Sequence, residues 1–285
     1  MIPRYDFHKK KYGDELLIDV IRLEDLQPYV ARHPTHQLTY FDITLITHGE
    51  GAFYIDGRQV MLGRGLVLFS SPGQVRSWDF REMPRGLVLI FENDFLSSFF
   101  NDALFVQKLC FFGYFSAPPC MELTASELGH IELLMVQISA EIGVRGAKDQ
   151  HLLRALLYQV LMLLNRMYLS RYAVSCGEWQ NRYIREFVVL VNIHGHRDRC
   201  VGFYARRLSV TAGHLNDLSK RYLGVSAKRY IIGRTLLEAK RLLAYTGMSV
   251  DEVASHLNYE TTSYFIRAFR ADTGQTPLAF RNQMK

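Results

Sequence analysis

The chain has 285 residues, 48% of them hydrophobic and 22% charged, which is typical of a soluble protein long enough for two domains. No apolar run approaches the roughly 18 residues of a membrane span, and no apolar stretch follows the basic start, so we expect a cytoplasmic protein without a secretory signal or a membrane partner. The net charge of +6 is unevenly placed: residues 178–285 hold 17 Lys and Arg against 9 Asp and Glu, a net +8, whereas the preceding residues hold 17 against 19. Such clustering suits a polyanion as the partner of the C-terminal part, and on charge alone a merely basic surface fits equally well.

Short apolar runs separated by glycine-containing turns predict β-strands between residues 41 and 91. The runs cover residues 43–46, 53–55, 60–62, 66–69 and 87–91. Asp56-Gly57, between the second and third runs, is typical of a two-residue hairpin, because a type I′ turn needs positive φ at both positions. We expect residues 1–120 to form a small antiparallel β-barrel.

Helices are expected after residue 123. Thr124 and Glu127 have the spacing of a capping box, which predicts a helix start. A second helix is predicted from about residue 149 to 172, because apolar residues recur there at intervals of three and four. They are Leu152, Leu153, Leu156, Leu157, Val160, Leu161, Leu164 and Met167. This face is wide enough to pack on the barrel or to pair with a second copy of the chain, and the pattern leaves both open. With a domain boundary expected at 175–177, residues 121–177 would form a helical dimerisation and linker region.

The basic C-terminal part, residues 178–285, is predicted to begin with a helix-turn-helix. The expected order is a helix over 203–208, a turn at 209–210 and a second helix over 211–222, ended by Gly224. Leu215 and Leu218 share one face of the second helix and are expected in the core. Asn216, Asp217 and Lys220 then point outward, as on a helix that reads bases in a major groove.

The same pattern recurs about fifty residues later. A helix is expected over 250–257, with Ser249 and Glu252 spaced as a capping box. A turn over 258–260 and a second helix over 261–272, ended by Gly274, should follow, and Phe265 and Phe269 form the buried stripe of that helix. One long helix over about residues 226–245 separates the two units. Twenty residues at ~1.5 Å each span ~30 Å, close to the ~34 Å between major-groove segments on one face of a duplex. One chain is therefore predicted to occupy two consecutive major grooves.

The stretch from Phe203 through Arg281 resembles the DNA-binding domain of AraC/XylS-type regulators. The resemblance is carried by HLNDLSKRYLGVSAKRYI, by RTLLEAKRLLAYTGMSVDEVASHLNYETTSYFIRAFRADTGQTPLAFR, and by the terminal Gly274-x-Thr276-Pro277-x-x-Phe280-Arg281. It implies a seven-helix domain that inserts two recognition helices into adjacent major-groove faces.

This resemblance also implies which side chains meet DNA. The candidates for base contact are Asn216, Asp217, Thr262, Ser263, Ile266 and Arg267. Asn216 suits a bidentate contact to adenine, and Arg267 suits guanine or a phosphate clamp. The candidates for phosphate contact are Lys220, Arg221, Arg229 and Arg270.

The N-terminal part resembles the cupin-like effector domain that many members of this family carry. His33, His36 and Asp42 are similar to the first cupin metal motif, but no histidine follows Pro72-Gly73. We therefore expect no metal, no cofactor and no catalytic residue, and instead a pocket for a small organic effector. Its candidate lining residues are His36, Tyr40, Tyr54, Arg76 and Trp78.

The predicted fold is α+β with two domains: a cupin-like antiparallel barrel followed by helices, and an all-α domain with two helix-turn-helix units. The predicted function is a sequence-specific transcription regulator modulated by a small organic effector. Its expected partners are double-stranded DNA, a second copy bound through the helix over 149–172, and RNA polymerase if the chain is an activator. Two alternatives are a cupin-fold metalloenzyme with a helical appendage and an architectural DNA-binding protein without a sensor.

Overall fold

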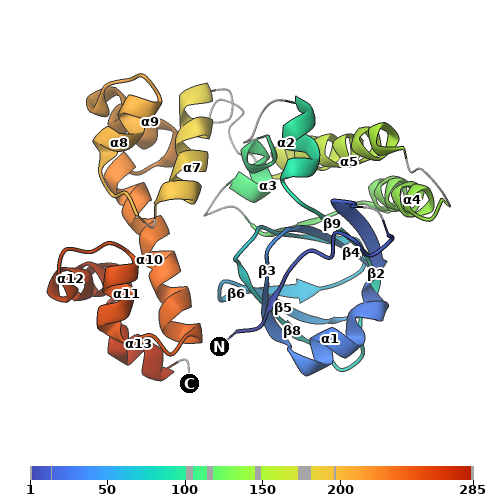
Figure 1. Cartoon of the computed structure of the whole chain (residues 1–285), viewed down its shortest axis with the longest axis horizontal. Helices are drawn as coiled ribbons and strands as arrows, with labels where there is room; N and C mark the ends of the chain where they lie inside the picture. The colour runs from blue at the N-terminus through green and yellow to red at the C-terminus, as the bar shows by residue number, and fades with distance from the viewer. Residues whose placement is uncertain are drawn as a thin grey trace. The chain divides into compact units, whose positions relative to one another are not determined.

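The computed structural model describes residues 2–13, 15–100, 105–113, 118–144, 149–172, 181–195 and 197–283. The chain divides into two compact units, residues 2–172 and residues 173–285 (Figure 1). The first unit holds two sheets and several helices, and the described part of the second holds helices alone, so the α+β class with two domains is confirmed. The boundary expected at 175–177 lies outside the described residues.

The first unit is built on two five-stranded sheets. One has the strand order β1 (Arg4–Tyr5), β3 (Thr35–Leu38), β8 (Val75–Asp79), β5 (Gly51–Ile55), β6 (Arg58–Leu62). The other has the order β10 (Cys120–Glu122), β7 (Leu66–Ser70), β4 (Phe41–His48), β9 (Arg85–Phe91), β2 (Ile18–Arg22). All five predicted runs are strands. One pairing departs from the expected antiparallel barrel, because β1 runs parallel to β3 at an edge.

The hairpin between β5 and β6 has the predicted turn. Asp56 has φ 49° and Gly57 has φ 81°, and Ile55 pairs directly with Arg58. This register turns Phe53 and Ile55 inward, where each is 1% exposed. Tyr54 lies on the opposite face of the strand, because successive side chains alternate.

The core between the sheets draws buried side chains from both. It is made of Leu23, Val30, Ile46, Phe53, Ile55, Val60, Leu62, Leu66, Leu68, Trp78, Val88 and Ile90. Leu23 lies in the short 3-10 helix η1 (Leu23–Leu26), and Val30 lies in α1 (Gln27–Arg32). Both η1 and α1 therefore pack against the sheet core.

The remaining helices of the first unit follow the strands. They are α2 (Asp94–Phe100), the 3-10 helix η2 (Val106–Lys108), α3 (Cys110–Gly113), α4 (Ala125–Ile142) and α5 (Gln150–Arg171). Most of the apolar face of α5 is used inside this unit: Leu153, Leu157, Val160, Leu161, Leu164 and Tyr168 are fully buried. By length and hydropathy α5 is also the one described helix able to cross a membrane, a test that a core helix of a soluble protein passes as well.

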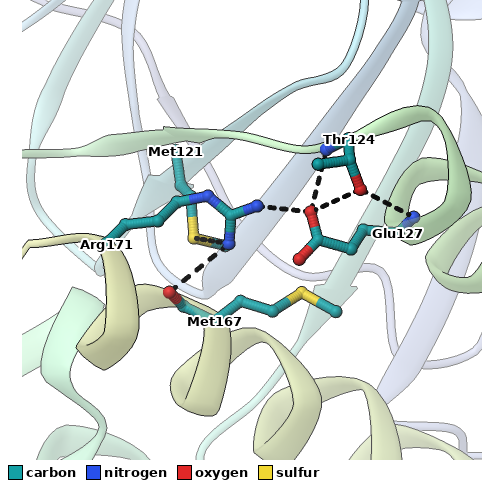
Figure 2. Close-up of polar contacts among 5 residues, drawn as sticks. All are labelled: Met121, Thr124, Glu127, Met167 and Arg171. Carbon is teal, nitrogen blue, oxygen red and sulfur yellow. Dashed lines mark hydrogen bonds and ion pairs between the residues drawn. The ribbon is translucent and has the colours of Figure 1, made fainter.

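The start of α4 and the end of α5 are joined by polar contacts (Figure 2). The predicted capping box is present, with the Thr124 amide donating to Glu127 Oε2 at 2.8 Å and the Glu127 amide to Thr124 Oγ1 at 3.4 Å. Arg171 donates to the same Glu127 oxygen and, at 3.4 Å, to the carbonyl oxygen of Met167. A third contact reaches Met121 Sδ at 3.9 Å, so Arg171 ties α5 to β10 and to the cap of α4.

The described part of the second unit contains seven helices. They are α7 (Arg182–His194), α8 (Val201–Arg207), α9 (Ala212–Leu223), α10 (Ala227–Tyr245), α11 (Val250–His256), α12 (Thr262–Thr273) and α13 (Pro277–Gln283). Both predicted helix-turn-helix units are present, as α8–α9 and α11–α12. The long helix α10 connects the first helix-turn-helix to the second (Figure 1).

Turns and caps delimit these helices as the sequence predicts. Gly224 and Gly274 end the two recognition helices in the left-handed region, with φ 70° and 77°, which glycine adopts at low cost. In the two turns Ser209 and Asn258 also have positive φ, 56° and 57°. The pairing of Ser249 with Glu252 is a second capping box, at the start of α11.

Candidate nucleic-acid interface and effector cavity

The recognition helix α9 presents a polar face to solvent. Thr211 caps its N-terminus by accepting a hydrogen bond from the His214 amide at 3.1 Å. Leu215 and Leu218 are buried, which leaves Asp217 and Lys220 exposed on the opposite side. This orientation is the one expected from the spacing of the apolar residues.

Asn216 is less exposed than its position in the helix predicts. It is half-buried, and its Oδ1 accepts a hydrogen bond from the Ala227 amide at 3.1 Å, at the start of α10. That bond occupies the atom that would accept in a bidentate contact to adenine, which leaves Nδ2 as the donor for a base. His214, which the sequence reasoning passed over, is exposed in the first turn of α9.

The second recognition helix, α12, is anchored by two phenylalanines. Phe265 and Phe269 are fully buried, at 0% exposure, while Ser263 and Arg267 are exposed. The other two candidates for base contact, Thr262 and Ile266, are half-buried. Tyr264, missed by the sequence reasoning, is 43% exposed beside them.

The candidate phosphate contacts fall into two groups. Lys220, Arg221 and Arg270 are exposed in the last turns of the recognition helices. Arg229 is held instead by Asp272 of α12 at 2.8 Å, although its side chain is half-exposed. Some basic charge serves the fold itself: Arg281 donates to the carbonyl oxygens of Leu243 and Met248.

A cavity of about 450 Å³ lies in the first unit, at one end of the sheet core. It is lined by strands β2, β3, β4, β8 and β9, by η1 and α1, and by the N-terminal segment that contains β1. Three of the five predicted lining residues, His36, Tyr40 and Arg76, belong to it. Segment residues Tyr5 and Phe7, which the sequence reasoning missed, add aromatic walls, with Phe7 edge-on to Tyr40 at 5.4 Å between ring centroids.

Tyr54 and Trp78 do not line this cavity, which corrects the expectation from sequence. Tyr54 lies on the outer face of β5, where its hydroxyl accepts a hydrogen bond from Gln59 Nε2 at 3.2 Å. Trp78 faces inward but is buried in the core against Phe53, with 4.7 Å between ring centroids. Strand alternation explains the first difference, and close packing against Phe53 explains the second.

A buried ion pair forms one wall of the cavity. Arg76 Nη1 lies 2.9 Å from Asp42 Oδ2, and both side chains are 3% exposed. Arg76 also donates to Ser70 Oγ at 3.2 Å, and Asp42 Oδ1 accepts from Thr44 Oγ1 at 2.9 Å. Arg76 Nε is buried and has no hydrogen-bond partner among the described residues.

His36 adds a neutral acceptor beside this pair. Its Nδ1 lies 3.0 Å from the carbonyl oxygen of His33, which can only accept, so Nδ1 carries the proton and Nε2 is the free acceptor. Burial, with a contribution from the nearby Arg76 charge, lowers the pKa of His36 to about 4. Burial also raises the pKa of Tyr40, which keeps its hydroxyl protonated.

A second buried carboxylate of the cavity lining, Asp19, is also paired with a basic group. Asp19, 4% exposed, accepts from Lys11 at 2.6 Å and from the Tyr12 hydroxyl at 2.8 Å. Each buried carboxylate that lines the cavity therefore has a basic partner. Across the described ranges, no group of three or more His, Cys, Asp or Glu has the arrangement of a metal site.

Two protein-family models match the chain. A helix-turn-helix domain matches residues 204–283, and an AraC-like ligand-binding domain matches residues 18–161. Among curated proteins, the chain is similar to the HTH-type transcriptional activator RhaS of Salmonella schwarzengrund, with 22% identity over 260 residues that cover 88% of each chain.

Other relatives match over a shorter part of the chain. The HTH-type transcriptional regulator YtdP of Bacillus subtilis is 35% identical over 81 residues, which are 28% of this chain and 10% of YtdP. The regulatory protein PocR of Salmonella typhimurium is 30% identical over 71 residues, which are 25% of this chain and 23% of PocR. The chain thus spans less than a quarter of these two relatives. Among solved structures, ToxT from Vibrio cholerae is 10% identical with a TM-score of 0.43, covering 94% of this chain and 98% of that one.

Proposed function

Because the chain belongs to the AraC-type family of transcription regulators, with a ligand-binding part followed by a helix-turn-helix part, we propose that it reads two adjacent major-groove segments under the control of a small effector. Membership makes it a DNA-binding regulator rather than the metalloenzyme considered as an alternative. We assign sensing to residues 1–120, dimerisation and linkage to 121–177, and DNA binding to 178–285. We also place the protein in the cytoplasm, where the DNA that it binds is found.

The two-groove reading rests on two exposed recognition helices carried by one long helix. With 19 residues, α10 is about 28 Å long, near the ~34 Å rise of one duplex turn. Ser263 and Arg267 on α12, and Asp217 on α9, are exposed for base edges, with Asn216 Nδ2, Thr262 and Ile266 at the border. Lys220, Arg221 and Arg270 are placed for phosphates, and Arg229 is available only if it leaves Asp272.

Selection from a random DNA library tests this function. The purified full-length protein is incubated with the library at near-physiological salt, and bound fragments are sequenced. We expect an enriched site with two conserved blocks one helical turn apart. A site with a single block contradicts the two-groove reading, and retention of all fragments alike contradicts sequence-specific regulation.

Two substitutions separate base readout from phosphate contact. Arg267→Ala should weaken binding to the selected site by ~1–3 kcal/mol and relax the base preference at one position. Lys220→Ala should weaken binding to all sequences alike and reduce the salt slope by about 1. Affinities measured at several salt concentrations on matched and altered sites distinguish them. Equal losses on every sequence for both variants would show that Arg267 contacts phosphate.

The effector cavity favours an uncharged polar molecule. Its buried carboxylates, Asp19 and Asp42, are both paired with basic groups, so a net charge on the ligand would meet no counter-charge inside. His36 Nε2 offers an acceptor, while Tyr5 and Phe7 supply aromatic walls. Since RhaS is an activator by name, we propose that the bound effector promotes activation through contact with RNA polymerase.

The dimer surface should lie on the outer faces of α4 and α5 rather than on the face of α5 predicted from sequence, which is largely buried in the protomer. Exposed apolar side chains there include Leu133 and Val136 of α4, at 56% and 49%, and Leu152 of α5, at 44%. Gly129, Leu133, Val136 and Ala140 follow a 4-3-4 spacing, which places them on one stripe of the helix. A second copy of the chain would cover it.

Val136→Lys tests this surface. A lysine in the contact would leave an unpaired buried charge, so we expect the dissociation constant of the dimer to rise at least about tenfold. Sedimentation equilibrium measures it, and Gln137→Lys, on the neighbouring exposed position, is the control with the same charge change. Equal dissociation of the two variants would place the dimer contact elsewhere.

A further inference from the structure

The two helix-turn-helix units, α8–α9 and α11–α12, have separate hydrophobic cores. One cluster contains Leu215 and Ile231, together with side chains of α7, α8 and α9. The other contains Leu236 and Phe269, together with side chains of α11, α12 and α13. The first part of α10 belongs to the first cluster and the remainder to the second. Among the described residues, no shared apolar core fixes the angle between the two helix-turn-helix units.

The Arg199 side chain connects the two helix-turn-helix units outside α10. Arg199 lies in the loop before α8, and its guanidinium donates to the carbonyl oxygens of Leu257 and, at 2.5 Å, of Asn258. The same group lies over the ring of Tyr259, 3.9 Å from the centroid. A second hydrogen bond runs the other way, from Asn258 Nδ2 to the carbonyl oxygen of Arg197 at 3.1 Å.

The acceptors of Arg199 are suited to a cation. Leu257 is the C-cap of α11, and Asn258 follows it in the turn with φ 57°. Carbonyl groups at a helix C-terminus lack helical donors and carry partial negative charge, and the planar fork of arginine can satisfy two of them at once. Arg199 therefore joins the loop before α8, in the first helix-turn-helix, to the turn between α11 and α12, in the second.

Beside this contact a hollow lies between the two helix-turn-helix units. It has a volume of about 530 Å³ and is lined by Asp198 and Lys228 on one side and by Glu260 and Tyr264 on the other, with Ile232 and Ala268 adding apolar lining. A hollow of this size keeps the two helix-turn-helix units out of close packing at this place. Their relative orientation then depends on α10, on the partly exposed pair between Arg229 and Asp272, on the hydrogen bond from Asn258 to Arg197, and on Arg199.

We propose that Arg199 is a positioning residue that sets the rotation of the second recognition helix relative to the first, and so the spacing of the two DNA blocks that the protein accepts. This inference rests on the proposed two-groove function. It assigns a basic residue of the DNA-binding part to a contact with protein carbonyl groups instead of DNA phosphate. The two roles predict different DNA-binding behaviour.

The test compares duplexes that carry the selected site with zero, one or two base pairs inserted between the blocks. One inserted pair rotates the second block by about 35° and moves it by ~3.4 Å. We expect the full-length wild-type protein to lose about tenfold or more in affinity at one insertion, and Arg199→Ala to lose about threefold or less. Arg199→Lys keeps the charge but not the planar fork. Its affinity should depend on the number of inserted base pairs, the spacing profile, as weakly as that of Arg199→Ala.

Controls separate positioning from loss of fold and from loss of charge. Arg182→Ala, an exposed arginine at the start of α7, removes the same charge and should keep the wild-type profile. Affinity for a duplex that carries the first block alone should be unchanged in both Arg199 variants, which shows that the first recognition helix remains folded. The salt slope should also be unchanged.

The outcomes are distinct. A wild-type spacing profile in both Arg199 variants overturns the positioning role, and a salt slope reduced by about 1 with uniform weakening assigns Arg199 to a phosphate instead. A wild-type protein that binds all spacings alike overturns the two-groove function itself, and the inference with it.

Discussion

Arg76→Leu is expected to lower the free energy of unfolding of the full-length protein's first unit by about 3–5 kcal/mol, because it leaves Asp42 charged and unpaired in the core. Thr44 and Ser70 still donate to Asp42, but neither supplies a charge. Urea unfolding followed by circular dichroism measures the loss. Arg64→Leu, at an exposed turn position, is the matched control and should change the free energy by less than about 0.5 kcal/mol.

The double substitution Arg76→Leu with Asp42→Val distinguishes a lost charge partner from lost packing. If the unpaired carboxylate causes the instability, the double variant should recover most of the free energy, since an apolar pair of similar volume is often as stable as a buried ion pair. A double variant as unstable as Arg76→Leu would show instead that the arginine stem packs irreplaceably against Phe53 and Trp78, whose rings lie 5.5 and 5.8 Å from its guanidinium.

Acidification is expected to destabilise the same unit through His36. Burial lowers the pKa of His36 from 6.5 to about 4, so between these values the unfolded chain binds more protons than the folded one. The stabilisation is therefore complete above pH 6.5 and is lost as the pH falls toward 4. For His36 alone this amounts to about 2 kcal/mol between pH 7.5 and pH 5.

The measurement is the free energy of unfolding from pH 5 to pH 7.5 for the wild type and for His36→Gln, which cannot take up a proton. The slope of the free energy of unfolding against pH should be smaller in His36→Gln than in the wild type, by the amount assigned to His36. His48→Gln, on an exposed histidine of β4, should keep the wild-type slope. Identical slopes in all three proteins would show that His36 is protonated as readily in the folded state as in the unfolded one.

Much of the fold was predictable because it is encoded locally. The turn at Asp56-Gly57, the capping boxes of α4 and α11, and the glycines after α9 and α12 each act within a few residues, and all lie where the sequence places them. The apolar spacing of α12 likewise predicted that Phe265 and Phe269 are buried and Arg267 exposed.

The parts that were not predictable depend on contacts between distant segments. The position of Asn216 within α9 indicates an outward side chain, but its bond to Ala227 joins α9 to the next helix. Tyr5 and Phe7 reach the cavity because a two-residue strand, too short to carry a pattern, pairs with β3. Leu152 and Leu153 look alike in sequence, yet one is 44% exposed and the other fully buried.

The separate cores of the two helix-turn-helix units have a consequence for how this protein can change. A substitution that repacks the cluster around Phe269 leaves the side chains around Leu215 in contact with the same neighbours. Under the proposed two-groove function, each recognition helix could thus acquire a new base preference without repacking the core of the other. Exchange of residues 250–283 for the equivalent part of a relative would then produce a hybrid regulator whose two half-sites come from different operators.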